Sequence, residues 1–471
     1  MNRHLSRLML ATAGISLLAL CSFTKEVTVA KALELTGPTY QSSVPKNLTL
    51  KDNTESEIRS YYNSLNSLAD SEKTGTNLLK NLKPILQEMT YYSYGACWQI
   101  YEITDREWAL SPVSSIVSGT YDAATQEVTN YTYGKDNPYL HDLYKNRDEN
   151  GITVEAGRIR ANDNHGDKKG GTDREHVWCQ SRGFKASSGA SGPAGTDVHH
   201  LLAGDSYVNQ LVHNDNAYGY VDKTQSYTDA GNNADTPYTA GNLKGKPLHT
   251  DAKDEGTTVF EPQDCDKGDI ARAVFYMAAC YNNYANASGV ISEFNPNLEI
   301  VSYVTAGDKA ITSSDTQTAT IGNLKDLLEW NALDPVDEYE IHRNNLIYNN
   351  YQHNRNPFVD FPDWANLIWG SEAGTKSANP QTDEISKGSA FVPSTSDSTN
   401  NGGSQESNLP IPLWLIIVIG VAVVIIVIIL LVAFPKLRKK ATKKVKSKAK
   451  KQVKSYAKGN SSSKSSSKKK K

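Results

Sequence analysis

The chain has 471 residues, more than one compact domain usually needs, and its formal net charge of −2 hides a strong asymmetry. Residues 436–471 contain sixteen lysines, one arginine and no acidic residue, so residues 1–435 carry −19. If residues 1–32, which carry a net positive charge, are also left out, residues 33–410 carry −22. This charge counts against a protein that clamps nucleic acid through a broad basic face, but an enzyme that needs only a local cationic groove is not excluded.

The first 32 residues have the organisation of a secretory signal peptide. Arg3 and Arg7 precede an apolar run over residues 8–20, and a small-residue pattern follows at residues 30–32. We therefore expect residues 1–32 to direct export.

A polar lead over residues 33–56 comes before one long globular block over residues 57–370. At the start of the block, residues 57–68 and 77–87 have apolar side chains at helical spacing. This spacing predicts two irregular helices, the second interrupted by Pro84.

The pattern then changes to aromatic and β-branched residues, which predicts short strands at residues 101–104 and 131–133. Helical spacing returns at residues 205–212 and again at residues 267–284. The sequence therefore predicts an α+β fold of mixed helices and short strands.

Chemically informative residues lie between these helices and strands. The sequence Asp-Arg-Glu-His-Val-Trp occupies residues 173–178, and Asp-Val-His-His-Leu occupies residues 197–201, with Asn209 further on. The two segments supply a base beside a carboxylate and a distant amide oxygen. These groups are sufficient to hold one hard divalent cation and to activate a water next to it. The pattern predicts a metal-dependent phosphodiesterase.

Each of these groups has an expected role. His176 is the candidate base, because an unperturbed imidazole is neutral near pH 7. Glu175 and Asn209 are candidate oxygen ligands for Mg²⁺, which keeps several of its waters. Neighbours on a regular strand point to opposite faces, so Glu175 and His176 can share a site only if the strand ends or bends there. The predicted helix at residues 205–212 carries Asn209, with His213 one turn later.

Cysteines give little guidance. Cys21 follows Leu20, which is not the small residue expected before a lipidated cysteine, so an ordinary signal-region cysteine is the preferred interpretation. The C-x-x-C spacing of structural zinc sites is absent. Four further cysteines allow one bridge, of which Cys265 with Cys280 is an option, and free buried thiols are the default: Cys97, Cys179, Cys265 and Cys280.

The C-terminal quarter of the chain differs in composition from the rest. Residues 371–410 are rich in Ser, Thr, Asn and Gly, which predicts a flexible stalk. Residues 411–434 contain no charge and are long enough to span a bilayer as one helix. The lysine-rich tail at residues 435–471 marks the cytoplasmic side, so we expect a single-pass membrane protein whose globular block faces outward.

Residues 173–181 resemble the strand that carries the Glu-His pair in the bacterial endonuclease I family, within the ββα-metal (His-Me finger) nuclease superfamily. Three later blocks agree with that family in order: residues 197–209, residues 260–273 and residues 354–370. The similarity extends from about residue 61 to residue 370.

The resemblance implies a ββα-metal finger with His176 as general base and with Glu175 and Asn209 as ligands of one divalent ion, usually Mg²⁺, with Mn²⁺ as a substitute. It also implies hydrolysis of DNA, with RNA as a further substrate class, to 5′-phosphate and 3′-hydroxyl ends with little sequence preference. The chain departs from the family pattern at two positions. Cys179 stands where Pro is common, and Val212 stands where an Arg is common.

Because an arginine is absent at position 212, either Arg182 or Arg174 is expected to stabilise charge in the transition state. His213 is a second-tier metal ligand. Three further residues have lesser expected roles: Asp197 and His199 as supports of the finger, and Arg355 as a phosphate contact, with an architectural role for Arg355 as the stronger reading.

Two other functions remain open at this point. A nuclease fold without activity could serve as a surface binding protein, although intact Glu175, His176 and Asn209 argue for an enzyme. A zinc hydrolase built on the several histidines would lack the H-E-x-x-H spacing of common zinc enzymes.

Overall fold

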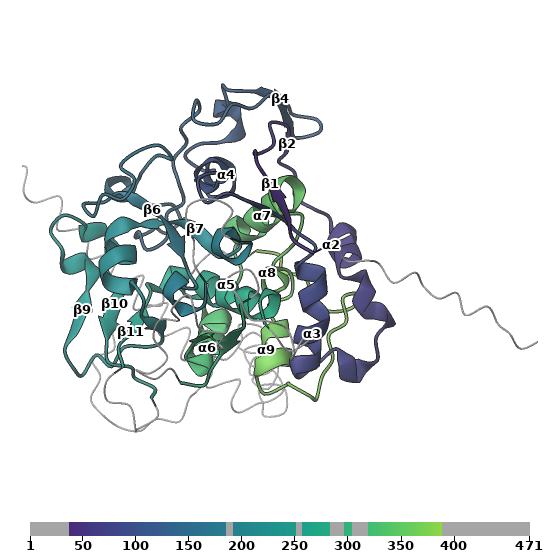
Figure 1. The fold of residues 1–471 in the computed structure, drawn as a ribbon. Coiled ribbons are helices and arrows are strands. Elements are labelled where there is room, and N and C mark those ends of the chain that lie inside the picture. The colour runs from purple at the N-terminus through teal and green to yellow at the C-terminus, as the bar shows by residue number, and fades with distance from the viewer. Residues whose placement is uncertain (1–36, 185–191, 251–256, 283–295, 304–318, 389–471) are drawn as a thin grey trace, which may run out of the picture. The chain divides into compact units, whose positions relative to one another are not determined.

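The computed structural model describes most of the globular block, and these described residues are shown in colour in Figure 1: 37–184, 192–250, 257–282, 296–303 and 319–388. The predicted signal peptide at residues 1–32, the apolar segment at residues 411–434 and the lysine-rich tail lie outside the described residues. Among the residues that the structure does describe, no helix combines the length and the apolar character that crossing a membrane requires.

Helices and short strands alternate irregularly along the chain, which confirms the predicted α+β class. The α-helices are α2 (Glu55–Tyr61), α3 (Gly75–Leu86), α4 (Cys97–Thr104), α5 (Lys267–Cys280), α6 (Leu324–Leu333), α7 (Glu338–Leu346), α8 (Pro357–Asp360) and α9 (Trp364–Trp369). The strands are β1 (Thr39–Gln41), β2 (Leu48–Thr49), β3 (Thr90–Tyr92), β4 (Thr120–Asp122), β5 (Glu127–Thr129), β6 (Thr172–His176), β7 (Leu201–Asp205), β8 (Ala217–Tyr218), β9 (Tyr227–Asp229), β10 (Leu243–Gly245), β11 (Val259–Glu261), β12 (Leu298–Ile300) and β13 (Ala319–Ile321).

The strands form several small sheets. The largest has four strands in the order β8-β11-β10-β9, and another has three in the order β2-β5-β4. Strands β1 and β3 pair in parallel, as do β12 and β13. Strands β6 and β7 form an antiparallel pair in which His176 lies opposite Leu201 and Thr172 opposite Asp205. The π-helix η7 (Val208–His213) follows β7 directly, which gives a strand–strand–helix unit.

Helix α5 is the central element of the main hydrophobic core. Thirteen of its fourteen residues are buried, because apolar or small side chains occupy all sides of the helix. It packs against α3, α6 and α8, which approach it from different parts of the chain (Figure 1). The predicted helix at residues 267–284 is therefore present, although it ends at Cys280.

The strand–strand–helix unit lies between two hydrophobic cores. On β7, Leu202 belongs to the core around α5, whereas Leu201 and Ala203 belong to the second core around α4. Val208 and Val212 of η7 add to the first core. Because successive strand residues point to opposite faces, β7 is fixed from both sides, and this arrangement holds the neighbouring β6 in place.

Two predicted strands are wrong. Residues 101–104 belong to helix α4, because Ile100, Tyr101 and Thr104 together with Cys97 recur at helical spacing and are all buried. Residues 131–133 are not a strand either. Strand β5 ends at Thr129, and the next residue, Asn130, has a positive φ of 56° that turns the chain away.

The two N-terminal helices agree with the prediction in position and differ in detail. Helix α2 ends at Tyr61, and a short 3₁₀ turn at Asn63–Ser67 replaces the rest of the predicted helix. Helix α3 continues through Pro84, which lies in its last turn and does not interrupt it. A proline near a helix end removes only one of the last hydrogen bonds.

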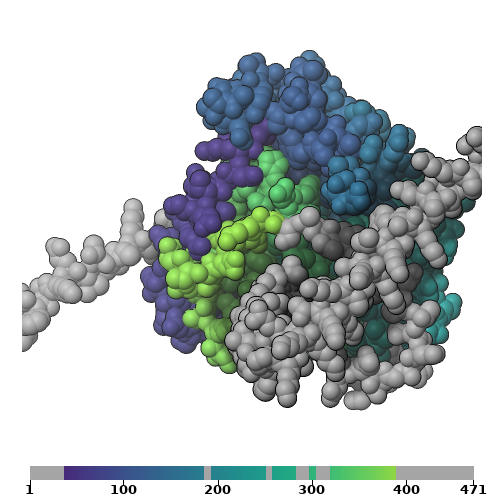
Figure 2. Space-filling model, turned by 180° about the vertical axis from the view of Figure 1, so that it is seen from behind, coloured from purple at the N-terminus to yellow at the C-terminus, as the bar shows by residue number. Residues whose placement is uncertain are grey.

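The predicted stalk is wrong in its first part, because residues 371–388 pack on the globular block. Ala378 and Ile385 are buried, and the Ala378 amide donates to the Lys73 carbonyl. Arg59 donates to the carbonyl of Pro380. Figure 2 shows these last described residues, in yellow-green, next to the N-terminal part in purple.

All four cysteines in the described residues are free, so the possible bridge between Cys265 and Cys280 is not formed. Cys97, Cys179 and Cys280 are buried, as the default interpretation expected.

Candidate active site

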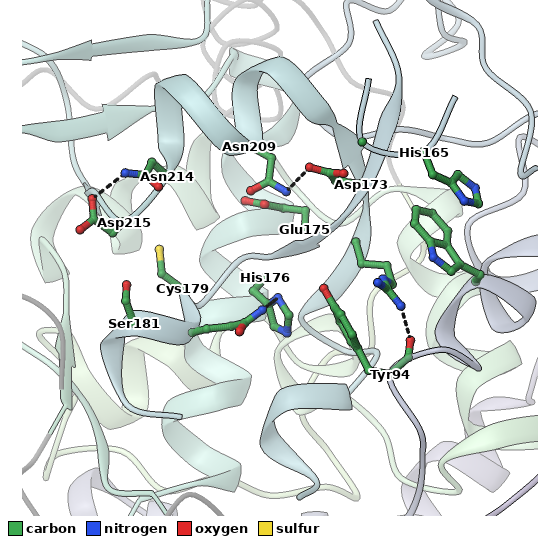
Figure 3. A pocket seen from close by; sticks show the side chains of 14 residues that line it. Tyr94, His165, Asp173, Glu175, His176, Cys179, Ser181, Asn209, Asn214 and Asp215 are labelled. Atoms are coloured by element: carbon green, nitrogen blue, oxygen red, sulfur yellow. Dashed lines mark hydrogen bonds between the residues drawn. The ribbon is translucent and has the colours of Figure 1, made fainter. Parts of the chain in front are cut away.

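A pocket of about 530 Å³ opens beside β6 (Figure 3). Its walls come from β6, from the turn after β6, from η7, and from the segment that begins α4. The pocket is lined by the three site residues predicted from the sequence: Glu175, His176 and Asn209. Segments far apart in the chain therefore bring the three side chains to one place.

The end of β6 explains how Glu175 and His176 reach the same pocket. His176 is the last residue of the strand. Because the regular strand stops there, the two neighbouring side chains do not have to point to opposite sides. The requirement that the strand end or bend at this position is met.

His176 is buried and has both ring nitrogens engaged. Its Nε2 lies 2.9 Å from the Gly195 carbonyl, which can only accept, so Nε2 carries the proton. The Gln180 amide nitrogen lies 2.9 Å from Nδ1 and donates to it. Burial lowers the pKa of His176 to about 4, although the Gly195 carbonyl and Glu175 oppose this shift. The ring is therefore neutral at pH 7, with its basic lone pair on Nδ1.

Glu175 is held through one of its two carboxylate oxygens. Oε1 accepts from the Tyr144 hydroxyl at 2.7 Å and lies 2.6 Å from Nδ1 of His213. The other ring nitrogen of His213 lies 3.3 Å from the Cys179 sulfur. Burial alone would lower the pKa of His213, but the Cys179 sulfur and the Glu175 carboxylate raise it to about 10. Both His213 nitrogens are occupied, so His213 supports Glu175 and is not placed as a metal ligand.

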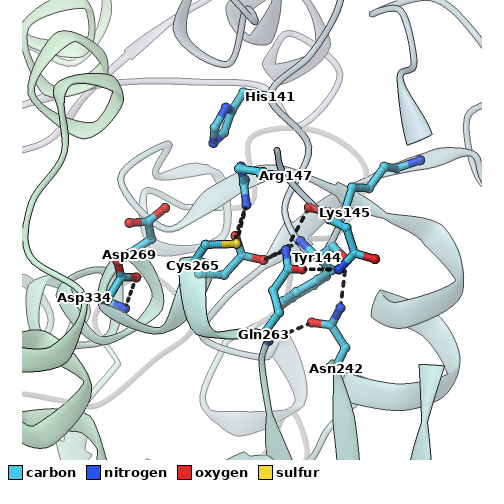
Figure 4. A network of polar contacts seen from close by, with 12 residues as sticks. His141, Tyr144, Lys145, Arg147, Asn242, Gln263, Cys265, Asp269 and Asp334 are labelled. Carbon is cyan, nitrogen blue, oxygen red and sulfur yellow. Dashed lines mark hydrogen bonds and ion pairs between the residues drawn. The ribbon is translucent and has the colours of Figure 1, made fainter. Parts of the chain in front are cut away.

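Tyr144, which orients Glu175, is itself fixed by a buried polar network (Figure 4). Its amide donates to Asp266 Oδ2 at 2.7 Å, and its carbonyl accepts from the Asn242 side chain at 2.8 Å. The Gln263 amide also donates to Asp266 Oδ2 at 2.8 Å. These contacts fix the backbone at Tyr144, and its hydroxyl therefore reaches Glu175 in a defined position.

Asn209 is oriented by a carboxylate from β6. Asp205 accepts from the first amides of the helical segment that contains η7, which fixes where this segment begins. The Asn209 amide nitrogen donates to Asp173 Oδ2 at 3.1 Å, and Gln210 donates to the same oxygen at 2.8 Å. Since Nδ2 is turned toward Asp173, the amide oxygen is left for the pocket. Figure 3 shows the side chains of Asn209 and Glu175 facing each other.

Of the two arginines expected to stabilise charge, Arg174 lines the pocket. Its guanidinium carbon lies 3.5 Å from the centre of the Tyr94 ring and 5.1 Å from that of Trp98. Arg174 also donates to the Tyr94 carbonyl at 2.7 Å. The cation is therefore held between aromatic rings at the wall of the pocket.

Arg182 and Arg355 lie elsewhere and have structural contacts. Arg182 is buried and donates to the carbonyls of Asp215 and Thr320. Arg355 is buried and forms a two-pronged ion pair with Asp360, with distances of 2.8 and 2.7 Å. Neither arginine lines the pocket, so the expected phosphate contact of Arg355 and the transition-state role of Arg182 have no support in their positions. For Arg355, the architectural role that the sequence favoured agrees with its contacts.

Asp197 and His199 join the connection between β6 and β7 to the core. Asp197 is fully buried and accepts from the hydroxyls of Tyr276 and Tyr281 at 2.7 and 2.8 Å. The Nε2 atom of His199 lies 3.1 Å from the side-chain oxygen of Asn354, and burial lowers the pKa of His199 to about 3. Asp197 and His199 therefore support the strand–strand–helix unit from the side of the core, and neither lines the pocket.

The structure also shows what Cys179 and Val212, the two departures from the pattern of the resembled family, contact. Cys179 lines the pocket and contacts His213, which connects the turn after β6 to the Glu175 support. Val212 is 1% exposed and packs into the core, so position 212 provides no cation to the pocket.

Sequence reasoning missed several residues of the pocket. The sequence motif contains Asp173 but assigns it no role, and it does not indicate Tyr94, Trp98 or His165. The aromatic-rich stretch around the start of α4 is the local signal for Tyr94 and Trp98. Within the described part of the chain, no group of three or more His, Cys, Asp or Glu side chains is arranged to hold a metal ion.

Comparison with known proteins agrees with the family resemblance found in the sequence. The family model described as Endonuclease I matches residues 74–363. An extracellular ribonuclease of Bacillus amyloliquefaciens is 32% identical over 299 residues, which cover 64% of this chain and 76% of that protein. An extracellular ribonuclease of Bacillus subtilis (strain 168) is 33% identical over 310 residues, which cover 65% of this chain and 88% of that protein. No solved structure is a significant match.

Proposed function

The chain belongs to the endonuclease I family, and from that premise we propose that it is a metal-dependent endonuclease that hydrolyses nucleic-acid phosphodiester bonds with His176 as general base. The observation that carries the proposal is the meeting of His176, Glu175 and Asn209 at one pocket. Both curated relatives are named extracellular ribonucleases, so we include RNA with DNA among the substrates.

In the proposed reaction, His176 takes a proton from an attacking water. The Gly195 carbonyl keeps the ring proton on Nε2, so Nδ1 is the atom that can accept. The water replaces the Gln180 amide at Nδ1 and gives up its proton there as its oxygen bonds to phosphorus. The phosphorus–O3′ bond then breaks, and the departing O3′ oxygen takes a proton from a solvent water, which leaves a 5′-phosphate and a 3′-hydroxyl.

The chemistry of the available oxygens fits Mg²⁺, with Mn²⁺ as a substitute. The two hydrogen bonds described at the Glu175 carboxylate, from Tyr144 and His213, both go to Oε1. The hydrogen bond from Asn209 Nδ2 to Asp173 turns the Asn209 side-chain oxygen toward the pocket. Glu175 and Asn209 would hold the ion, because carboxylate and amide oxygens suit a hard cation that keeps several waters. When bound, such an ion neutralises charge on the phosphate and stabilises the leaving oxygen.

Arg174 is the side chain of this pocket that we assign to transition-state charge. It is a permanent cation on the pocket wall, whereas the chain as a whole is acidic outside the lysine-rich tail. A local cation of this kind grips the phosphate backbone common to all sequences, which agrees with little sequence preference.

We also propose that the enzyme is anchored in the membrane with its nuclease domain outside the cell. The support comes from the sequence: the signal-like residues 1–32, the uncharged residues 411–434 and the lysine-rich tail. Fractionation of cells that produce the full chain or a chain truncated after residue 410 tests this proposal. The full chain should pellet with membranes and the truncated chain should appear in the medium, whereas release of both chains would contradict anchoring.

The test of the proposed chemistry is the identity of the product ends. Purified full-length protein is incubated with single-stranded RNA and with DNA, with Mg²⁺, after chelation, and after Mg²⁺ is restored. We expect cleavage that is lost on chelation and restored by Mg²⁺ or Mn²⁺, with 5′-phosphate ends on both substrates. A 2′,3′-cyclic phosphate on the RNA product would show attack by the neighbouring hydroxyl and would contradict water activation by His176.

A further inference from the structure

One wall of the pocket is lined by four flat groups in contact with one another, here called the aromatic platform: Tyr94, Arg174, Trp98 and His165. The Arg174 guanidinium lies between the rings of Tyr94 and Trp98, at 3.5 and 5.1 Å from their centres. The His165 ring lies 3.6 Å from the Trp98 ring at an interplanar angle of 3°.

The loop that carries His165 is shaped to hold this ring in place. The His165 Nε2 atom lies 2.6 Å from the Ala161 carbonyl. The amide of Gly166 donates to the Thr172 carbonyl at the start of β6, and Asn164 has a positive φ of 47°. Asn and Gly tolerate this conformation, so the tight loop is encoded locally. The position of His165 on Trp98 is therefore a built feature of the pocket wall.

Exposure distinguishes this stack from an ordinary core cluster. Tyr94, Trp98 and Arg174 are half-buried, and His165 at the end of the stack is exposed. Within the described residues, Trp98 is the one ring that stacks on His165. Among the described residues no second ring stacks on His165, so its exposed outer face can accept another flat group.

The platform begins next to the candidate base. The Tyr94 ring lies 5.6 Å from the His176 ring at an angle of 25°. A single strand whose phosphate lies at His176 and Glu175 can therefore follow this wall of the 530 Å³ pocket from Tyr94 toward His165.

We propose that the aromatic platform is a stacking subsite for one unpaired nucleobase of the strand whose scissile phosphate lies at His176, with the outer face of His165, at the far end of the platform, as the contact surface. The proposal rests on the proposed function and adds the substrate class, single-stranded nucleic acid. In a duplex both faces of a base are covered by its neighbours, so a paired base cannot stack on the platform. Every base has a π-face, so the subsite tolerates all sequences.

Binding in the presence of EDTA tests the subsite separately from catalysis. Full-length protein purified in detergent is titrated into a fluorescent single-stranded RNA, the matching duplex, and a single strand that lacks all bases. We expect His165→Ala to raise the Kd for the single strand by roughly 5- to 150-fold, the range of base–aromatic stacking, and to change the Kd for the duplex and for the strand without bases less than about twofold. His165→Phe should bind the single strand as the wild type does, because a flat ring without charge is enough for stacking.

The matched control is His342→Ala, which removes a ring that contacts Trp108 outside this pocket and should leave all three Kd values unchanged. Equal weakening of the three ligands by His165→Ala, or failure of His165→Phe to restore binding, would show a charge or folding effect and overturn the stacking subsite. The absence of measurable wild-type binding to the single strand would also overturn it. A wild-type protein that binds the single strand but does not cleave it when Mg²⁺ is added would instead count against the proposed chemistry alone.

Discussion

The orientation of the Asn209 amide depends on Asp173, and an Asp173→Asn variant tests that dependence. In the wild type, Asn209 Nδ2 donates to Asp173 Oδ2 at 3.1 Å, which leaves the Asn209 oxygen facing Glu175. Asparagine at position 173 keeps the shape of the side chain but can donate as well as accept. The Asn209 amide can then turn by half a rotation and present its NH₂ group, which cannot bind a cation, to the pocket.

The expected magnitude follows from the contact that is lost. A hydrogen bond to a charged group contributes about 1.5–3 kcal/mol, and loss of a residue that orients a metal ligand typically lowers metal affinity by about 10- to 100-fold. We therefore expect Asp173→Asn to raise the Mg²⁺ concentration for half-maximal cleavage by about 10- to 100-fold, with a smaller fall in the rate at saturating Mg²⁺. The assay is the initial cleavage rate of a fluorescent RNA over a Mg²⁺ titration.

Gln210→Met is the matched control for this variant. Gln210 donates to the same oxygen of Asp173 at 2.8 Å, but its amide is not a candidate ligand. We expect its half-saturating Mg²⁺ concentration to stay within about twofold of the wild-type value. Wild-type Mg²⁺ dependence in Asp173→Asn, or an equal shift in Gln210→Met, would refute the argument that Asp173 orients a metal ligand.

Two further predictions concern the titration of His199 and the roles of the two candidate arginines. His199 has a folded-state pKa of about 3, so between pH 6.5 and 3 the unfolded chain takes up a proton that the folded chain does not, and stability falls as pH falls. In urea unfolding between pH 6.5 and 5, His199→Asn should therefore lose about 1.4 kcal/mol less per pH unit than the wild type; identical slopes would refute this sign. Arg174→Met should lower the cleavage rate with little change in melting temperature, whereas Arg182→Met should lower the melting temperature because it removes a buried side chain that donates to two part-buried carbonyls. The reverse pattern would assign the catalytic cation to Arg182.

The local part of the candidate site could be predicted from the sequence. Glu175 and His176 are neighbours in the chain, and the need for the strand to end at that point follows from strand geometry alone. Asn209 lies on a helical segment that Asp205 begins, which is also a local signal. The predicted helix at residues 267–284 was found because its run of apolar and small residues is longer than a strand usually is.

The supporting contacts could not be predicted, because they join distant parts of the chain. Tyr144 reaches Glu175 over 31 positions, and Arg174 reaches Tyr94 over 80 positions. The periodicity of the sequence does not indicate such pairs, because tertiary packing brings them together. Tertiary packing also explains the error at residues 101–104, where aromatic and β-branched residues favoured a strand but burial of one helical face in the second core prevailed.

The central claim is that the Nδ1 atom of His176 activates the attacking water, and the most direct test is the rate of RNA cleavage by His176→Ala at saturating Mg²⁺. General-base catalysis contributes about 10²- to 10⁴-fold, so the variant should cleave at least about 100-fold more slowly than the wild type while it still binds the RNA. A His176→Ala enzyme that cleaves at the wild-type rate would contradict the account.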